Sequence, residues 1–396
     1  MRINFLSTIV VPDNIKLARY LRSPDLGPKI LFFSGGTALK KACSELIQYT
    51  HHSIHIITPF DSGGSSAILR EAFKMPAIGD VRNRLLSLAD RSIQGSPEIF
   101  SLFAHRFHPD DNEMELKKEF KRMIEGKHPM VSTIPDPMRK IIRHHLKLFE
   151  NYMPEGFSFK KASIGNIILT AGYLNNQRRM DTVIFIFSKL VEVRGIVRPV
   201  INKYLHLTAE LENGDIVVGQ HLLTAKEADP IQSKIIKLFI SERRQNPKPV
   251  MPKIRNKMKA LIEEADLICY PIGSFYSSLI ANLLPSGVGK AIAKNPCPKV
   301  YIPNIKGDPE TFGIDINDQI KTLISYLTKD DPDNLSTNHV LNFIIMDLKS
   351  GQYNGNVDIS FFQNQGIQII DFPLVSSDSA PFLDEKLFVP VLMSLC

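Results

Sequence analysis

Two short apolar runs, each followed at once by a loop of glycine and hydroxyl residues, constrain the fold of this chain more than any other feature. The first run is KILFF at residues 29–33, and the loop SGGT follows at residues 34–37. Apolar residues then recur at offsets 0, 3, 4, 7 and 8 from Leu39, which is one face of an amphipathic helix. The second run, residues 53–58, leads into PFDSGGSS at residues 59–66 and another helical pattern. Continuously apolar strands that alternate with helices predict a parallel sheet with helices on both faces.

The same rhythm returns in the last third of the chain. We expect strands at residues 266–270, 299–302, 339–346 and 366–370, and helices at residues 277–292 and 384–395. Between the two α/β regions, residues 204–218 alternate around Asn213-Gly214, which is typical of a β-hairpin. Residues 182–187 are β-branched like a strand but continue a helical face to residue 193, so both interpretations stay open.

The patterns predict one large α/β domain with two additions. Residues 1–28 form an N-terminal extension, and residues 29–396 form the domain. Within the domain, residues 109–155 are charged and helical in pattern, with no strand, so we expect an all-helical insertion. Because the insertion interrupts the α/β rhythm, we expect it to pack beside the carboxyl edge of the sheet as a movable cover.

Composition and charge exclude several classes of protein. The chain is 43% hydrophobic, so it can bury a large core, yet it has no apolar run long enough to span a membrane. Its N-terminus lacks a signal-peptide pattern and its four cysteines are scattered, which favours a reducing cytoplasm. The net charge is +7, but 41 acidic residues are interspersed among the basic ones. The basic cluster at residues 253–259 lacks the aromatic side chains on which nucleic-acid bases stack. We therefore expect a cytoplasmic protein that binds neither nucleic acid nor membranes. The sequence leaves the oligomeric state open, with a homodimer as one alternative.

The glycine-rich loops are candidate phosphate-binding sites. Small residues between a strand and a helix let backbone N–H groups and the helix dipole approach a phosphate closely. Both loops follow strands of one parallel sheet, so they should meet at its carboxyl edge, where open α/β sheets bind ligands. A third loop, GSFYSS at residues 273–278, should lie at the same edge. We therefore expect a nucleotide or other phosphorylated ligand, and a bulkier residue at Gly36 should lower ligand affinity while the fold survives.

Two polar residues stand where further helices should begin. Asp80 lies in GDVRNR at residues 79–84, ahead of an expected helix at residues 85–90, and Ser163 opens the segment SIGN at residues 163–166. Each residue would serve well as a helix N-cap, and each could instead face a ligand at the sheet edge.

Two histidine clusters have spacings that a metal site could use. The first, His51, His52 and His55, straddles an expected helix end and strand start, so the side chains need not share a face. We expect no metal site there or at the pair His105 and His108.

The order of several motifs carries a resemblance to a known family. SGGTA at residues 34–38, PFDSGGSSAILR at residues 59–70 and AIGDVRN at residues 77–83 resemble the GGTG-type, DDGGSSGRLR-type and GDIRN-type segments of the CofD/YvcK family. Further matching segments are SIGN at residues 163–166, RGIVRPV at 194–200, AELENG at 209–214, EADLI at 264–268 and PKVYIPN at 298–304. The resemblance runs from about residue 30 to the C-terminus. It is closest to the CofD-like branch associated with bacterial ATP-grasp and kinase gene clusters.

The resemblance implies a Rossmann-like three-layer sandwich, and it makes residues 181–193 a helix. CofD transfers a phospholactyl group from a guanylyl-linked donor to a deazaflavin hydroxyl with Mg²⁺ and releases GMP. YvcK proteins resemble UDP-sugar-binding regulators without an established reaction. The family therefore implies either a transferase that moves a phosphorylated group to an acceptor hydroxyl, or a nucleotide-sugar-binding regulator.

Each candidate residue then has an expected role. In the transferase interpretation Asp80 orients or deprotonates the acceptor hydroxyl, and Asp61 holds Mg²⁺. The expected ligand-binding residues are Ser34, Gly35, Gly36, Thr37, Gly63, Gly64, Ser65, Ser66, Arg70, Arg82, Asn83, Gly165, Asn166, Gly273, Ser274, Tyr276 and Ser278.

Three departures from the family pattern bear on these roles. Ala38 replaces the fourth glycine of the first loop, and PIGS at residues 271–274 replaces a GPGS-type segment. Asp61-Ser62 replaces paired aspartates, and the loss of one carboxylate favours the regulator.

Overall fold

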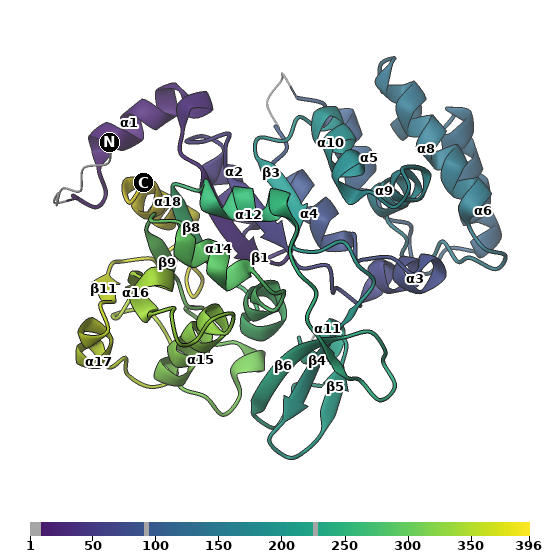
Figure 1. Ribbon diagram of the computed structural model, residues 1–396. Helices are drawn as coiled ribbons and strands as arrows, with labels where there is room; N and C mark the ends of the chain where they lie inside the picture. The colour runs from purple at the N-terminus through teal and green to yellow at the C-terminus, as the bar shows by residue number, and fades with distance from the viewer. Residues whose placement is uncertain (1–8, 91–94, 225–228) are drawn as a thin grey trace.

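The computed structural model describes residues 9–90, 95–224 and 229–396, and a seven-stranded sheet forms its centre (Figure 1). The strand order is β11-β10-β9-β8-β1-β2-β3, and every neighbouring pair is parallel. The strands are β1 (Ile30–Ser34), β2 (Ile54–Ile57), β3 (Ile196–Pro199), β8 (Leu267–Tyr270), β9 (Lys299–Tyr301), β10 (Phe343–Met346) and β11 (Gln368–Asp371). The predicted parallel sheet is therefore confirmed.

The alternation of side chains along β1 explains why helices cover both faces of the sheet. Successive strand residues point to opposite faces. Ile30 and Phe32 are buried in the apolar core on one face, and Leu31 and Phe33 are buried in the core on the other. A run of this kind is stable only where both faces are covered, because each exposed apolar side chain would forfeit its burial free energy.

Two layers of helices provide that cover and complete a Rossmann-like three-layer sandwich. The first layer shares the core of Ile30 and consists of α2 (Lys40–Leu46), α4 (Gly79–Ser87) and α18 (Glu385–Ser394). The second shares the core of Leu31 and consists of α12 (Asn256–Glu263), α14 (Val288–Lys294), α15 (Ile316–Thr328) and α16 (Thr337–Val340). At the sheet edge, α17 (Ile359–Asn364) packs beside β11.

A group of helices extends beyond β3, at the right of Figure 1. The group consists of α3 (Gly64–Phe73), α5 (Pro97–Ala104), α6 (Glu113–Glu125), α7 (Pro129–Ser132), α8 (Met138–Tyr152), α9 (Ile164–Asn175) and α10 (Met180–Leu190). The expected insertion at residues 109–155 thus consists of α6, α7 and α8, and α8 packs along α9. The helix α10 decides the open assignment at residues 182–187 in favour of helix.

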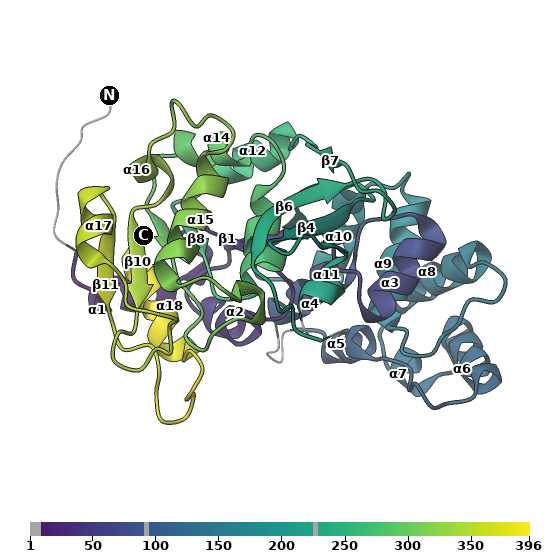
Figure 2. The ribbon, with the colours of Figure 1, turned by 90° about the horizontal axis from the view of Figure 1, so that it is seen from below.

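A second, antiparallel sheet follows the helices. Its order is β5-β4-β6-β7, and the strands are β4 (His206–Leu211), β5 (Ile216–Val218), β6 (Ile235–Ser241) and β7 (Pro249–Val250). The turn between β4 and β5 contains Gly214 at φ +89°, a left-handed conformation that favours glycine, so the predicted hairpin is confirmed. The short helix α11 (Gln220–Leu223) follows β5. In Figures 1 and 2 this sheet lies between α15 and the helices α3 and α9.

Several predicted boundaries are wrong. The expected helix at residues 277–292 is interrupted near Pro285: a π-helical segment (Phe275–Ile280) and α13 (Ala281–Leu283) precede the break, and α14 follows it. The expected strand at residues 339–346 begins only at Phe343, because α16 occupies the preceding residues. The helices α3 and α4 begin earlier than expected, at Gly64 and Gly79, so the second loop and Asp80 both belong to helix starts.

The N-terminal extension packs on the last helix of the chain. Its helix α1 (Asn14–Arg22) is followed by a 3₁₀ turn (Pro24–Leu26). Lys16 Nζ donates to the carbonyl oxygens of Ser394 and Cys396 at 3.1 and 2.6 Å, next to buried Leu17. The extension is therefore joined to the α/β domain. No helix in the described ranges is long and apolar enough to cross a membrane.

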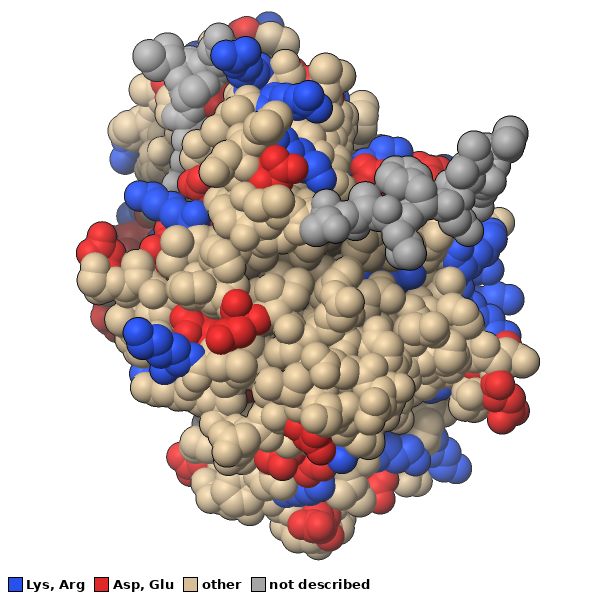
Figure 3. Space-filling model, turned by 90° about the vertical axis from the view of Figure 1, so that its left-hand side faces the viewer, with Lys and Arg blue, Asp and Glu red and all other residues tan. Residues whose placement is uncertain are grey.

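Charges of both signs occur on the face of the molecule that carries α1, β11 and α17. Figure 3 shows Lys and Arg side chains near Asp and Glu side chains around a broad uncharged area. This face therefore presents no extended field of one sign, although the net charge is +7.

Candidate functional site

A pocket of about 410 Å³ lies where the strand order of the main sheet changes direction. From β1 the chain continues to β2 and β3 on one side, and β8 to β11 follow on the other side. In open α/β sheets such a switch point leaves a crevice outside the carboxyl ends of the strands. The pocket is lined by Gly35, Gly36, Thr37, Ala38, Asp61, Gly63, Gly64, Ser65, Ser66, Gly79, Asp80, Arg82, Asn83, Arg106, Asn166, Gln220, His221, Thr224, Ser274 and Ser278. The three predicted loops thus meet at one edge.

The glycines of the first loop make room for neighbouring protein segments. A Cβ on Gly36 would overlap the Asp80 carboxylate and lie 2.7 Å from the Asp80 Cα. A Cβ on Gly35 would lie 2.6 Å from Ser278 Oγ. The first loop therefore packs directly against α4 and the third loop, in addition to lining the pocket. A bulkier side chain at Gly36 would push the start of α4 away, so we expect it to lower stability in addition to affinity.

We predict that Gly36→Ala lowers both stability and ligand affinity. The new methyl group must push Asp80 and its backbone away, and overpacking of this kind costs about 1–3 kcal/mol of unfolding free energy. Urea unfolding and a binding titration measure the two effects. The control is Ala38→Gly, which adds no atom to the same loop. Native stability in Gly36→Ala would contradict the close packing.

The buried guanidinium of Arg84 holds the first loop from below. Arg84 is fully buried, and its Nη2 donates to the Gly35 carbonyl at 2.7 Å and to Ser34 Oγ at 3.2 Å. Its Nη1 donates to Cys43 Sγ at 2.7 Å. Ser34 therefore supports the loop from within the core and does not line the pocket, contrary to its expected role as a ligand-binding residue.

The second loop is held in place by Arg70. This buried side chain donates to the carbonyl oxygens of Asp61 at 3.0 Å and Leu205 at 2.6 Å, which ties the loop to the residue before β4. Arg70, an expected ligand-binding residue, does not line the pocket and supports the loop from outside it. Ser62 is also directed away: its Oγ lies 2.8 Å from His221 Nδ1 of α11. Asp61 is the side chain of this pair that lines the pocket.

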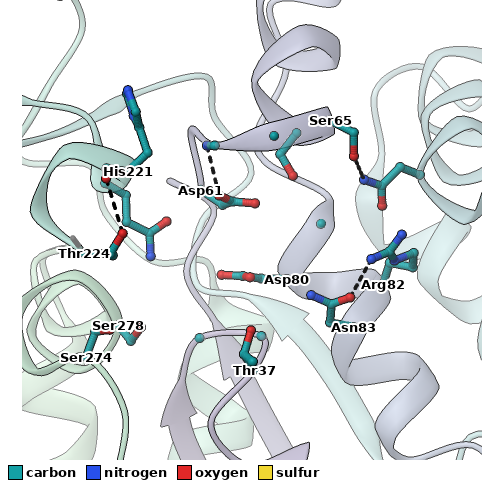
Figure 4. A pocket seen from close by; sticks show the side chains of 18 of the residues that line it. Thr37, Asp61, Ser65, Asp80, Arg82, Asn83, His221, Thr224, Ser274 and Ser278 are labelled. Carbon is teal, nitrogen blue, oxygen red and sulfur yellow. Dashed lines mark hydrogen bonds between the residues drawn. The ribbon is translucent and has the colours of Figure 1, made fainter. Parts of the chain in front are cut away.

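Asp80 is directed into the pocket and is not the N-cap of α4. The N-cap is Ile78, and Asp80 is the second residue of the helix. Its Oδ2 accepts from Thr58 Oγ1 at 3.4 Å. In Figure 4 the carboxylates of Asp61 and Asp80 both occupy the middle of the pocket. Ser163 does precede α9, yet it makes no side-chain capping bond, and its Oγ accepts from Arg82 Nη1.

Two guanidinium groups lie on the α9 side of the pocket. Arg82 is 7% exposed, and its Nη2 donates to Asn83 Oδ1 at 2.6 Å. Gly165 does not line the pocket but makes room for this side chain, since a Cβ there would lie 2.8 Å from Arg82 Cδ. Burial, then the positive charge of Arg106, lowers the pKa of Arg82 to about 10, against the opposing effect of Asp61 and Asp80. The pocket therefore combines two carboxylates with two nearby cations.

The third loop differs from a phosphate cradle because protein side chains already occupy its N–H groups. The N–H of Gly273 donates to Asn304 Oδ1 at 2.8 Å, and that of Phe275 donates to Asp308 Oδ2 at 2.6 Å. The N–H groups of Tyr276 and Ser277 both donate to Glu310 Oε2. Gly273 and buried Tyr276 therefore do not line the pocket, contrary to expectation, whereas the side chains of Ser274 and Ser278 do.

We predict that Glu310 makes stability depend on pH. Burial, then the charge of Asp308, raises the pKa of Glu310 from 4.5 to about 8, so folding favours the protonated form. The contribution of Glu310 to the unfolding free energy is therefore complete below about pH 4.5 and is lost as the pH rises through about 8. Between these limits, the difference between the unfolding free energies of the wild type and of Glu310→Gln should change with pH. The value for the wild type should fall relative to that of the variant by up to about 1.4 kcal/mol per pH unit. Urea unfolding of both proteins from about pH 5 to 8.5 measures the difference, and a constant difference would contradict the shift.

Three buried polar atoms in residues that line the pocket have no hydrogen-bond partner in the described part of the protein. They are Arg82 Nε, Asn166 Oδ1 and Gln220 Oε1. Each belongs to a residue no more than 7% exposed. An unpaired buried polar atom costs about 1–3 kcal/mol, so three in one pocket indicate a polar ligand that pairs with them.

Ala38 and Gly79 line the pocket from within predicted motifs, although neither was an expected site residue, and four further lining residues were not found by sequence reasoning: Arg106, Gln220, His221 and Thr224. Arg106 follows α5, and the other three lie on or just after α11, far from the glycine loops in sequence. No local pattern marks them, so only the tertiary fold brings them to the pocket. Conversely, residues 109–155 contribute nothing to the lining, so the predicted cover is not found: the insertion packs behind α9, and Phe149 contacts Phe73 of α3.

The histidine clusters have other surroundings. His51 Nδ1 lies 2.6 Å from Asp25 Oδ1, and His55 is buried in β2, stacked on Phe32. Among the described residues, no group of three or more His, Cys, Asp or Glu side chains could hold a metal ion. Mg²⁺ uses one or two protein carboxylates together with phosphate oxygens and water, and Asp61 and Asp80 are the carboxylates that line the pocket.

Comparisons with known proteins agree with this architecture. The family model described as 2-phospho-L-lactate transferase CofD matches residues 30–375. The gluconeogenesis factor of Bacillus subtilis is 29% identical over 301 residues, which is 76% of this chain and 75% of the relative. The putative gluconeogenesis factor of Thermoanaerobacterium thermosulfurigenes is 27% identical over 377 residues, 93% and 97% of the two chains. A solved structure of a UPF0052 family member from Bacillus halodurans superposes with a TM-score of 0.64 at 23% identity. The superposition covers 92% of this chain and 98% of the solved one, and it confirms the fold.

Proposed function

The chain belongs to the CofD family, and from this premise we propose that it binds a nucleotide-linked phosphorylated donor and transfers the donor's phosphoryl-bearing group to an acceptor hydroxyl. One observation carries the proposal: two carboxylates, two guanidinium groups and three unpaired buried polar atoms converge in a pocket at the switch point of the sheet. Such a set is costly for stability alone and is suited to a charged, hydrogen-bonding ligand.

The chemistry assigns separate roles to the two carboxylates. The acceptor oxygen forms a bond to phosphorus while the bond from phosphorus to the nucleotide's oxygen breaks, and the nucleotide leaves with that electron pair. The hydroxyl proton passes to the carboxylate of Asp80. Arg82 lies close enough to Asp80 for their charges to interact, so it can also meet the negative charge of the phosphoryl group.

We propose Mg²⁺ as the cofactor, with Asp61 as its protein ligand. Asp61 Oδ2 lies 2.9 Å from the position of a Cβ on Gly79, the residue before Asp80, so the two carboxylates are neighbours across the start of α4. When bound, the cation would neutralise phosphate charge. Asp61 also accepts from the N–H of Gly63 at 3.2 Å, which orients its side chain.

The serine at position 62 affects this proposal less than the sequence suggested. Ser62 is 4% exposed and contacts His221 of α11, where it also accepts from the His221 N–H at 3.3 Å. A carboxylate directed as Ser62 is would face His221 of α11, whereas Asp61 and Asp80 themselves line the pocket. The change from paired aspartates to Asp61-Ser62 therefore leaves both pocket carboxylates in place.

A regulator that binds a nucleotide-sugar without turnover is the second candidate function. It is favoured by the relatives named gluconeogenesis factors, since that name denotes no reaction. Both candidates need the same pocket to bind a phosphorylated ligand, and they differ only in whether a bond is broken.

Native mass spectrometry of the purified protein tests the shared part of both proposals. We expect a mass increment that matches a nucleotide, a nucleotide-sugar or a deazaflavin, and we expect collisional release to identify it. The same protein is then titrated with ADP, GDP, CDP, UDP and their hexose conjugates. A protein that is purified without any such ligand and binds none of these compounds would refute both functions.

A further inference from the structure

We propose that the pocket holds its ligand in one orientation, with an anionic group in the corner between Arg82 and Arg106 and an uncharged hydrogen-bonding group against Gln220. The inference rests on the proposed function, because it assigns the two ends of the same ligand to two halves of the same pocket.

The first step is that neither arginine forms a salt bridge in the described part of the protein, although the charge of Asp61 acts on both. Arg82 Nη1 and Nη2 donate to Ser163 and Asn83, while its buried Nε has no partner. Arg106 Nη1 donates to Ser65 Oγ at 3.0 Å and to the Lys161 carbonyl at 2.7 Å. Within the described ranges neither guanidinium has a carboxylate oxygen within 4.0 Å. The repulsion between them would be relieved by an anion bound in the corner.

The second step is that further hydrogen-bond donors lie in this corner, beside the unpaired acceptor Asn166 Oδ1. Ser65 Oγ accepts from Arg106 and from Asn166 Nδ2, each at 3.0 Å, so both lone pairs are used and its proton remains for a ligand. Ser65 is also in the first turn of α3, a ten-residue helix whose N-cap is Gly63 and lacks a side-chain cap. The positive end of the helix dipole therefore adds to the two guanidinium groups, and a phosphate or carboxylate fits this set.

The third step is that the opposite half offers an acceptor and hydroxyl groups. Gln220 is 7% exposed, and its Nε2 donates to the Ser277 carbonyl at 3.2 Å. This bond fixes the amide and leaves Oε1 without a partner. The hydroxyl groups of Thr224, Ser274 and Ser278 line the same half. An acceptor held in this way would pair with an N–H or O–H of a base or sugar and would repel a phosphate.

The fourth step is that the two aspartates separate these halves. In Figure 4 Thr224, Ser274 and Ser278 lie on one side of Asp61 and Asp80, and Ser65, Arg82 and Asn83 lie on the other. The imidazole on the first side, His221, is already paired with Ser62. A ligand that spans both halves therefore places its central part beside the two carboxylates, where the proposed reaction occurs.

Titration calorimetry with two kinds of probe tests the orientation. The probes are inorganic pyrophosphate, which has only the anionic end, and ADP, GDP, CDP and UDP, which have both ends. We expect Arg106→Gln to weaken pyrophosphate and the best-binding nucleoside diphosphate alike, by about tenfold or more. We expect Gln220→Met to weaken the nucleoside diphosphate by about tenfold and to leave pyrophosphate within about twofold.

The chain offers a matched control for each variant. Arg143→Gln changes a partly buried arginine that donates to the Ile124 carbonyl outside the pocket, and Gln319→Met changes a buried glutamine on α15. Neither should alter the affinity for any probe. If Gln220→Met weakens pyrophosphate as much as the nucleoside diphosphate, or if Arg106→Gln spares pyrophosphate, the orientation is wrong and the binding function stands. If the wild type binds neither kind of probe, the binding function fails with it.

Discussion

Replacing Asp80 with asparagine should abolish turnover while ligand binding persists. The amide has the shape of the carboxylate and can still accept from Thr58 Oγ1, so the pocket should keep its form. It cannot take the proton of an acceptor hydroxyl, and removal of a general base lowers rates by about 10²–10⁴-fold. Release of the nucleotide from the donor measures turnover, and calorimetry measures binding. The structure makes this test cleaner, because Ile78 and not Asp80 is the N-cap of α4.

The outcomes of this variant separate the two candidate functions. Turnover in the wild type that is lost in Asp80→Asn supports the transferase. Binding without turnover in both proteins supports the regulator. Unchanged turnover in the variant would remove Asp80 from the mechanism. A matched control is Asp318→Asn, an aspartate in the first turn of α15 that lies outside the pocket lining, and it should behave as the wild type.

The layout of the sheet could be predicted because it follows from short-range patterns. The run at residues 29–33 is apolar without interruption, which requires a strand covered on both faces, and a parallel sheet brings the ends of its strands to one edge. The meeting of the three loops at the pocket is a consequence of that topology alone. The roles of the individual loop residues depend in addition on contacts with distant segments of the chain.

The third loop shows where sequence reasoning failed. A glycine-serine segment before a helix predicts free N–H groups, yet Asn304, Asp308 and Glu310 occupy them. These side chains follow β9, about one strand-helix unit further along the chain, so no window of sequence around the loop contains them. The same applies to Gln220, which reaches the pocket from α11, after the strand β5 of the second sheet. Partners supplied by distant segments are decided by the packing of the whole domain.

The helix α4 shows what periodicity could have added. Residues two apart on a helix differ by about 200° in direction, whereas residues four apart share a face. Asp80 and Arg84 therefore both face the first loop, and Arg82 points toward α9. The guanidinium beside the reacting group is consequently Arg82, and Arg84 has a structural position beneath the loop.

Because Arg84 and Arg82 point in different directions from α4, we expect different effects when each is replaced, and the effect of replacing Arg84 on stability and binding should be large. Arg84→Met should lower the unfolding free energy by about 2–3 kcal/mol and abolish ligand binding. The variant leaves the Gly35 carbonyl without its buried donor, and the first loop loses the side chain that holds it against α4. Urea unfolding measures the stability, and a titration with the ligand identified by mass spectrometry measures the affinity.

The matched variant is Arg82→Met, two residues earlier on the same helix. Its guanidinium is also buried, but it bonds to two side chains and not to a backbone carbonyl of the first loop. One of them, Asn83, lines the pocket, where water can replace the guanidinium. Removal also relieves the burial that lowers its pKa to about 10 and the repulsion from Arg106. We therefore expect stability within about 1 kcal/mol of the wild type and affinity for a phosphorylated ligand at least about tenfold weaker. Equal loss of stability in the two variants would show that both arginines are structural, and Arg106 would then be the remaining guanidinium of the pocket.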